Sequence, residues 1–156
     1  MSSQTDLHFS SETDQWATPQ LVFDWLDLEL GPHDLDAAAD NTNNKCDNFI
    51  DSSVDALAVD WVGTNVWLNP PYSSIISEFI NKICNSNVEA VVLTNNSTDT
   101  KWYQQAAINC NAICFTSGRI NFYNTEQKKS SPTNDKVFFI LETIKKNLIV
   151  FLRRLV

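Results

Sequence analysis

Apolar residues recur along this chain with two different periods, and the alternation of the two periods predicts an α/β protein. Apolar residues three or four positions apart predict helices at residues 19–30, 73–84, 101–109 and 144–155. Short apolar runs predict strands at residues 35–39, 65–68, 88–94, 112–116 and 136–141. Helices that alternate with apolar strands imply a mostly parallel sheet with helices on both faces, and the final pair around residue 138 is expected to include an antiparallel edge strand.

Residue types at the helix ends support this assignment. Thr18 followed by Pro19 is a typical helix start, with the threonine as the capping residue. Ser73 or Ser74 is expected to cap the following helix.

The chain has 156 residues, which predicts one domain. Residues 1–13 are polar and without period, so they are expected to form a flexible arm, and residues 14–156 the domain. The first residues show neither a cationic start nor an apolar run, and no stretch of eighteen apolar residues exists. These features predict an intracellular protein that does not associate with membranes.

The strand predicted at residues 65–68 runs directly into Asn69-Pro70-Pro71-Tyr72. Because proline cannot donate a hydrogen bond to a sheet, the strand should end here, with Asn69 at its carboxyl end. Ligands bind at that edge of an open α/β sheet.

The four residues suit methyl transfer to an amine conjugated with a ring, whose delocalised lone pair makes the nitrogen a poor nucleophile. The Asn69 side-chain oxygen and the Pro70 carbonyl can accept hydrogen bonds from that amine, and the adjacent Pro71 helps to hold the carbonyl in place. Tyr72 offers an aromatic face on which a planar base can stack. The alternative is a strand terminator followed by a core tyrosine.

Asp36 lies inside an otherwise apolar stretch and is followed by Ala37, Ala38 and Ala39. A buried carboxylate needs a partner, either a backbone donor or a cationic ligand, and the small alanines allow a ligand to approach the backbone closely. With three glycines in the whole chain and no glycine-rich turn after a strand, a cofactor without phosphates fits best.

The net charge of −8 argues against a nucleic-acid partner until it is divided along the chain. Residues 1–100 carry −14, whereas residues 101–156 carry +6. This asymmetry predicts a basic surface in the last third that can face phosphates, while chance clustering of lysines is the alternative. The four cysteines are scattered and only two histidines are present, so free thiols are expected and a metal site is not.

Six blocks in this order resemble the phage-type, Dam-like DNA adenine-N6 methyltransferases. They are Asp14-Gln15-Trp16-Ala17-Thr18-Pro19, Leu35-Asp36-Ala37-Ala38-Ala39, Asp55-Ala56-Leu57, Trp67-Leu68-Asn69-Pro70-Pro71-Tyr72, Thr98-Asp99-Thr100-Lys101-Trp102 and Gly118-Arg119-Ile120-Asn121-Phe122. The resemblance implies a single Rossmann-like domain, S-adenosyl-L-methionine as cofactor, double-stranded DNA as partner and a flipped adenine as target. It also implies a cytoplasmic enzyme, acting in the host cytoplasm if phage-encoded, and a role in evading restriction.

The resemblance assigns roles to particular residues. Trp16, Thr18 and Pro19 correspond to the segment that holds the methionine carboxylate, and a helix start suits an anion. Asp36, next to Ala38, corresponds to the acid that meets the methionine amine.

Asp55 corresponds to the acid that reads the adenine or ribose of the cofactor, with Asp51 and Asp60 as nearby alternatives. The catalytic roles go to Asn69, Pro70, Pro71 and Tyr72.

The predicted DNA contacts are Lys101, Arg119, Lys128 and Lys129. Only the loops at residues 95–101 and 124–135 are free for target recognition, so the DNA recognition sequence is expected to be short or loosely specified. A homodimer could supply more DNA surface. The alternatives are methylation of RNA or of a protein glutamine, and a catalytically silent DNA-binding or decoy protein on the same fold.

Overall fold

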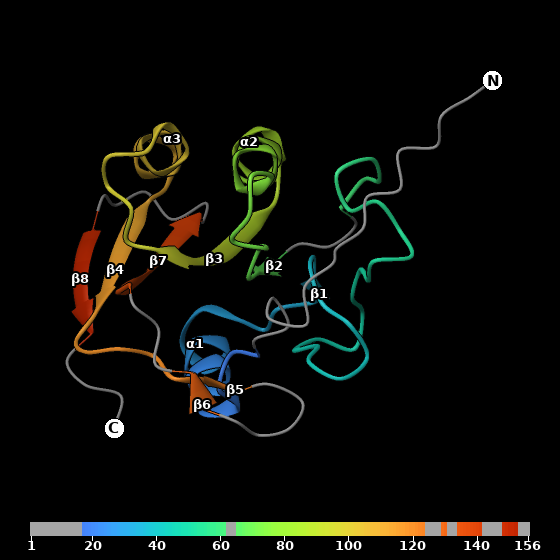
Figure 1. Ribbon diagram of the computed structural model, residues 1–156, viewed down its shortest axis with the longest axis horizontal. Helices are drawn as coiled ribbons and strands as arrows, with labels where there is room; N and C mark the ends of the chain where they lie inside the picture. Colours follow the sequence, from blue (N-terminus) through green and yellow to red (C-terminus); the bar gives the residue numbers. More distant parts are fainter. Residues whose placement is uncertain (1–16, 62–64, 124–128, 131–133, 142–147, 153–156) are drawn as a thin grey trace.

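A computed structural model describes residues 17–61, 65–123, 129–130, 134–141 and 148–152 (Figure 1). Its helices are α1 (Gln20–Leu30), α2 (Ile76–Asn85) and α3 (Lys101–Asn109). Its strands are β1 (Leu35–Asp36), β2 (Asn65–Leu68), β3 (Glu89–Asn95), β4 (Ala112–Thr116), β5 (Phe122–Tyr123), β6 (Lys129–Ser130), β7 (Lys136–Leu141) and β8 (Leu148–Leu152).

The main sheet has the strand order β1-β2-β3-β7-β4-β8, and β5 pairs with β6 in a separate small sheet. β1, β2 and β3 are parallel neighbours, and β4 and β8 form a parallel pair. β7 runs antiparallel to both of its neighbours, β3 and β4. The expected mixed α/β sheet is therefore present, with β7 as the antiparallel strand.

β7 lies in the interior of the sheet, so the expectation of an antiparallel edge strand near residue 138 is wrong in position. All six of its residues are buried. An edge strand leaves one row of backbone groups unpaired, whereas β7 is paired along both sides, with β3 and with β4.

The expected terminal helix is also wrong in its described part, because residues 148–152 form β8. Their apolar run fits a helical stripe and a buried strand equally well. These residues form a strand because they pair in parallel with β4, from Leu148 opposite Ala112 to Leu152 opposite Thr116.

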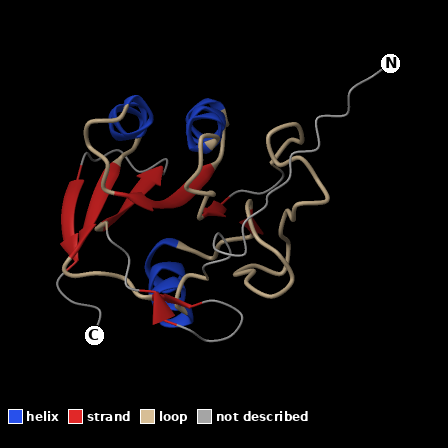
Figure 2. Ribbon diagram, viewed as in Figure 1, coloured by secondary structure: helices blue, strands red, loops and turns tan. Residues whose placement is uncertain are grey.

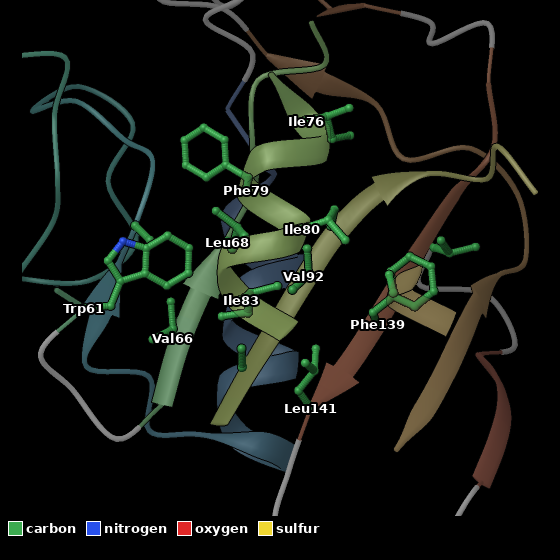
Figure 3. Close-up of a cluster of buried hydrophobic side chains, with 14 of the residues drawn as sticks. Trp61, Val66, Leu68, Ile76, Phe79, Ile80, Ile83, Val92, Phe139 and Leu141 are labelled. Carbon is green, nitrogen blue, oxygen red and sulfur yellow. The ribbon is translucent and has the colours of Figure 1, made fainter. Parts of the chain in front are cut away.

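Two apolar clusters lie on the main sheet. One packs α2 and α3 on the sheet and includes Phe79 and Ile80 of α2 together with Val92 and Phe139 of the strands (Figure 3). The other joins α1, through Leu26, to Trp67 and Phe138. In Figure 1, α2 and α3 lie on one side of the sheet and α1 on the other.

The connection between β1 and β2 contains no helix in its described part, residues 37–61 (Figure 2). It returns along β1, where the Asp36 N–H donates to the Asn48 carbonyl and the Ile50 N–H donates to the Asp36 carbonyl, both at 2.9 Å. This long loop therefore has its own fixed place beside the first strand. Among the described residues no helix is long and apolar enough to cross a membrane.

The expected capping residues are not the observed ones. α1 is preceded by Pro19 in the capping position, which has no side-chain acceptor, and Thr18 lies one residue too early. α2 is preceded by Ile75, so Ser73 and Ser74 also lie too early to cap it.

Candidate active site

Asn69 to Tyr72 follow β2 directly, as predicted, and the chain then turns into α2. The four residues of β2 and Pro70 are buried, while Asn69 is half-buried. The Tyr72 hydroxyl donates a hydrogen bond of 2.8 Å to Asn69 Oδ1 and lies 3.4 Å from the Leu93 carbonyl oxygen. The asparagine and tyrosine side chains are thus joined to one another at the end of the strand.

Tyr72 has an exposed part and a buried part. It is 39% exposed as a residue, yet its hydroxyl points inward to Asn69 and to the main chain of β3. Burial of this hydroxyl raises the pKa of Tyr72. The hydroxyl therefore remains a hydrogen-bond donor at neutral pH, while another part of the residue is exposed.

Asp36 lies at the end of β1, beside Trp67 of β2, and is 2% exposed. Its Oδ2 accepts from the Lys45 N–H at 3.0 Å, and its Oδ1 accepts from the Ala38 N–H at 3.4 Å. Burial nevertheless raises the pKa of Asp36 to about 6, because desolvation outweighs these hydrogen bonds and the Lys45 charge. A cation beside this carboxylate would therefore stabilise its ionised form.

A small polar pocket brings together the ends of β1 and β2, the residues before α1 and the loop after β1. Its lining residues are Ala17, Thr18, Asp36, Ala38, Asn43, Lys45, Trp67 and Asn69. Four of these, Thr18, Asp36, Ala38 and Asn69, are predicted site residues that lie far apart in the sequence. Asn69 Nδ2 lies 3.5 Å from Thr18 Oγ1 across the pocket.

Asn43 and Lys45 line the pocket although no sequence motif singled them out. Both lie in the loop that returns along β1, and this return is a tertiary feature. The Lys45 ammonium donates to Gln20 Oε1 at 3.0 Å, and burial lowers the pKa of Lys45. The signal that could have found it was one lysine in an asparagine-rich loop just after the acidic strand end.

Lys136, at the start of β7, is a further residue that the sequence did not single out. It is 4% exposed and its Nζ donates to Asn95 Oδ1 at the end of β3. The same Nζ lies 4.0 Å from the centroid of the Tyr72 ring and 5.0 Å from that of Phe122. A buried ammonium group thus contacts the aromatic residue of the motif.

Other predicted site residues lie elsewhere. Pro19 precedes α1 and is half-buried outside the pocket lining, and Trp16 is outside the described residues. Asp55 is exposed in the loop before β2, where its Oδ1 accepts from the Leu57 N–H at 2.9 Å, and it does not line the pocket. Among the described residues, no group of three histidine, cysteine or acidic side chains could hold a metal ion.

The predicted DNA contacts are surface residues where they are described. Lys101 is exposed at the start of α3. The Arg119 Nε lies 4.0 Å from Asp135 Oδ1, and both side chains are more than half exposed. A surface pair of this kind is weak, so Arg119 can exchange it for a phosphate. Lys128 lies outside the described residues, and Lys129 is described through its backbone in β6.

The turn Asn69-Pro70-Pro71-Tyr72 lies at a strand end, and a buried carboxylate lies in the adjoining pocket. This arrangement is the one expected of an amino methyltransferase. The profile of the DNA N-6-adenine-methyltransferase (Dam) family matches residues 4–154. The chain belongs to this family.

Two phage proteins are similar over most of the chain. The DNA N-6-adenine-methyltransferase of Haemophilus phage HP1 is 35% identical over 131 residues, which cover 81% of this chain and 76% of that protein. The DNA N-6-adenine-methyltransferase of Escherichia phage T1 is 32% identical over 155 residues, which cover 85% of this chain and 64% of that protein. The second relative therefore extends well beyond the region it shares with this chain.

Proposed function

We propose that this protein transfers a methyl group from S-adenosyl-L-methionine to the N6 amino group of an adenine that has left the stack of double-stranded DNA. The observation that carries the proposal is that Asp36 and Asn69 line one pocket at the ends of adjacent parallel strands. Asp36 suits the cofactor and Asn69 suits the amino group of the target, so the methyl donor and the methyl acceptor can lie close together. The mixed sheet is, in this proposal, a Rossmann-like methyltransferase sheet with a long loop in place of its first crossover helix.

The residues of the pocket fit the amino-acid end of the cofactor. Asp36 is buried, carries a raised pKa and would receive the methionine amine. Lys45 is the cationic member of the pocket lining and, with the segment of Trp16, Thr18 and Pro19, suits the methionine carboxylate. Bound here, S-adenosyl-L-methionine supplies the methyl group as part of a sulfonium ion.

The pocket has room for only part of the cofactor. It encloses about 220 Å³, some of it open to solvent. Pockets that enclose a whole ligand measure roughly 300 to 1,000 Å³. We therefore assign the adenosine part to the loop before β2, where Asp55 is the proposed contact and Asp51 and Asp60 are its neighbours.

Asn69 and Pro70 bind the amine and Tyr72 receives the base. An amide oxygen has two lone pairs, so the bond from the Tyr72 hydroxyl leaves Asn69 Oδ1 one position for an N6 hydrogen and fixes the orientation of the amide. The Pro70 carbonyl accepts the other hydrogen, and Pro71 restrains it. Both hydrogen bonds strengthen as positive charge develops on the nitrogen, which forms its bond to the methyl carbon as the carbon–sulfur bond breaks. The sulfur would leave as a neutral thioether, and the methylated nitrogen would then release a proton to water.

Positive charge in the last third of the chain would contact the DNA backbone. We propose Lys101, Arg119, Lys128 and Lys129 for these contacts, supported by the exposure of Lys101 and Arg119. Leaving the stack costs a few kcal/mol, and stacking on Tyr72 would recover about 1 to 3 kcal/mol per base.

The test is expression in a host that lacks adenine methylation, followed by sequencing that detects methylated adenine. The proposal predicts methylation at one short sequence, and the Asn69→Ala variant, made at equal level, should leave that sequence unmodified. Methylated RNA or glutamine with unmodified DNA would favour the alternative substrates. Cofactor binding without any methylation would favour a silent DNA-binding protein.

A further inference from the structure

The group that the proposed mechanism leaves unexplained is the buried ammonium of Lys136. Lysine is almost never fully buried unless it is paired, and Lys136 is 4% exposed. Among the residues that the structure describes, no carboxylate lies within ion-pair distance of its Nζ. Burial lowers the pKa of Lys136 to about 8, which means that desolvation makes the charged form of this side chain less stable than it is in water.

The three hydrogens of the ammonium group have three acceptors around them. Asn95 Oδ1 takes a hydrogen bond, and the rings of Tyr72 and Phe122 present their π-electrons at 4.0 and 5.0 Å. This set satisfies the cation within the protein. Lys136 is therefore arranged to hold these side chains around it.

Lys136 covers one face of the Tyr72 ring. Because Lys136 is itself buried, any ring surface within the exposed part of Tyr72 lies on the other face and the edges of the ring. The hydroxyl is fixed separately by Asn69. The ring is thus held from behind and at its tip, and its free face is turned outward.

We propose that Lys136 is a positioning residue for the target base: its ammonium group, held by Asn95 and Phe122, fixes the Tyr72 ring so that the opposite face stacks on the extruded adenine. This inference rests on the proposed function, because it supposes that a base stacks on Tyr72. It adds a cation behind the stacking surface, supplied by β7, the antiparallel strand inserted beside β3.

The experiment compares wild-type protein with Lys136→Met, which keeps the length of the side chain and removes the charge. The probe is duplex DNA with 2-aminopurine at the target adenine of the mapped methylation sequence. Its fluorescence reports extrusion and stacking of the base, while anisotropy of an end label reports overall DNA binding. Lys136→Met should weaken base capture about five- to thirtyfold, the range of a desolvated cation–π contact. Overall DNA binding at low salt and cofactor affinity should stay unchanged.

A double-mutant cycle with Tyr72→Leu separates positioning from general stabilisation. If Lys136 acts through the ring, Lys136→Met should cause no further loss of base capture in the Tyr72→Leu background. Phe122→Leu is the matched control, since it removes the other ring contact and should have a smaller effect on base capture. Thermal unfolding of each variant shows whether it is folded.

Three outcomes distinguish the positioning role of Lys136 from the proposed function on which it rests. No 2-aminopurine response in the wild-type protein would overturn the proposed function. A wild-type response that Lys136→Met leaves unchanged would overturn the role of Lys136 alone. Lys136→Met could weaken base capture equally in the wild-type and Tyr72→Leu backgrounds and also lower the unfolding temperature. That result would make Lys136 a structural residue.

Discussion

Asn69 is held on both sides of its amide group. Its oxygen accepts from the Tyr72 hydroxyl at 2.8 Å, and its nitrogen lies 3.5 Å from Thr18 Oγ1. In the proposed function, these contacts set which end of the amide faces the substrate amine. A preorganised acceptor is worth most at the transition state, since it needs no reorientation as charge develops.

Asn69→Ala should therefore lower the single-turnover methylation rate by roughly a hundred- to a thousandfold, the loss found for one preorganised polar partner. Cofactor affinity and DNA affinity should change little. Tyr72→Phe, which keeps the ring and removes the hydrogen bond to Asn69, should be mild, below about tenfold. A normal methylation rate in Asn69→Ala would show that the turn at residues 69–72 only ends the strand and has no catalytic role.

Asp36 makes the stability of the protein depend on pH in an unusual direction. Its pKa in the folded protein is about 6, against 3.8 as the ordinary value, so the folded state holds its proton longer than the unfolded state does. The contribution of this carboxyl to stability is therefore present below about pH 4 and is lost as the pH rises to about 6. The full shift corresponds to at most about 3 kcal/mol.

Denaturant unfolding of wild-type protein and of Asp36→Asn at pH 4, 5, 6 and 7 tests this. Relative to the variant, the wild type should lose about 2 to 3 kcal/mol of unfolding free energy across that range. The other carboxyl groups titrate in both proteins and cancel in the difference. Cofactor affinity of the wild type should be about tenfold weaker at pH 5 than at pH 7.5, because the carboxyl must first release its proton. A pH-independent difference between the two proteins would contradict the raised pKa.

At the scale of elements, α3 shows the helix start that α1 and α2 lack. Thr100 precedes the helix, and its Oγ1 accepts from the Tyr103 N–H at 3.3 Å. Tyr103 in turn packs edge-on against Phe139 of β7, with ring centroids 5.0 Å apart. The cap therefore supports the helix that covers the centre of the sheet.

Thr100→Ala should lower the free energy of unfolding by about 1 kcal/mol, within the usual range of 0.5 to 2 kcal/mol for a lost cap. Thr100→Ser keeps the acceptor and should be nearly neutral. Chemical denaturation at neutral pH measures both. Equal stabilities of the alanine and serine variants would show that the hydrogen bond to the Tyr103 N–H contributes nothing.

For the whole molecule, the important feature is the separation of charge, from −14 in residues 1–100 to +6 in residues 101–156. Arg119 belongs to the basic part, and its ion pair among the described residues is the weak surface pair with Asp135. Lys82 belongs to the acidic part, and its ammonium is engaged by the carbonyl oxygens of Leu57 and Val59 at 3.1 and 2.7 Å. The two cations should differ in their contact with DNA.

Arg119→Gln should reduce the slope of log binding constant against log salt by about 0.9, the loss of one phosphate contact. Lys82→Gln, the matched control, should leave the slope unchanged. Fluorescence anisotropy between low and moderate salt gives both slopes. The same slope for wild type and Arg119→Gln would place the DNA away from Arg119.

Sedimentation of the free protein would test the homodimer, which remains a prediction.

Local patterns determined most of the elements and the centre of the site. The helix at residues 101–109 and the strands at 112–116 and 136–141 follow from the period of their apolar residues, and they are observed with those bounds. The strand end at Asn69 follows from two prolines that cannot pair. Asp36 could be found because a carboxylate within an apolar run demands a partner. Each of these inferences uses information from a few neighbouring residues.

The tertiary structure alone decided what depends on residues far apart in the chain. Whether residues 148–152 form a helix or a strand, and whether β7 is an edge or an interior strand, are questions of pairing between distant segments. The loop that returns along β1 brought Lys45 to Asp36, and the insertion of β7 beside β3 brought Lys136 to Tyr72. Periodicity reports the local environment of a segment, whereas a lysine's partner is set by which strands lie side by side. That is why the sequence could predict the acid and the turn but not the two lysines beside them, the half-buried Lys45 and the buried Lys136.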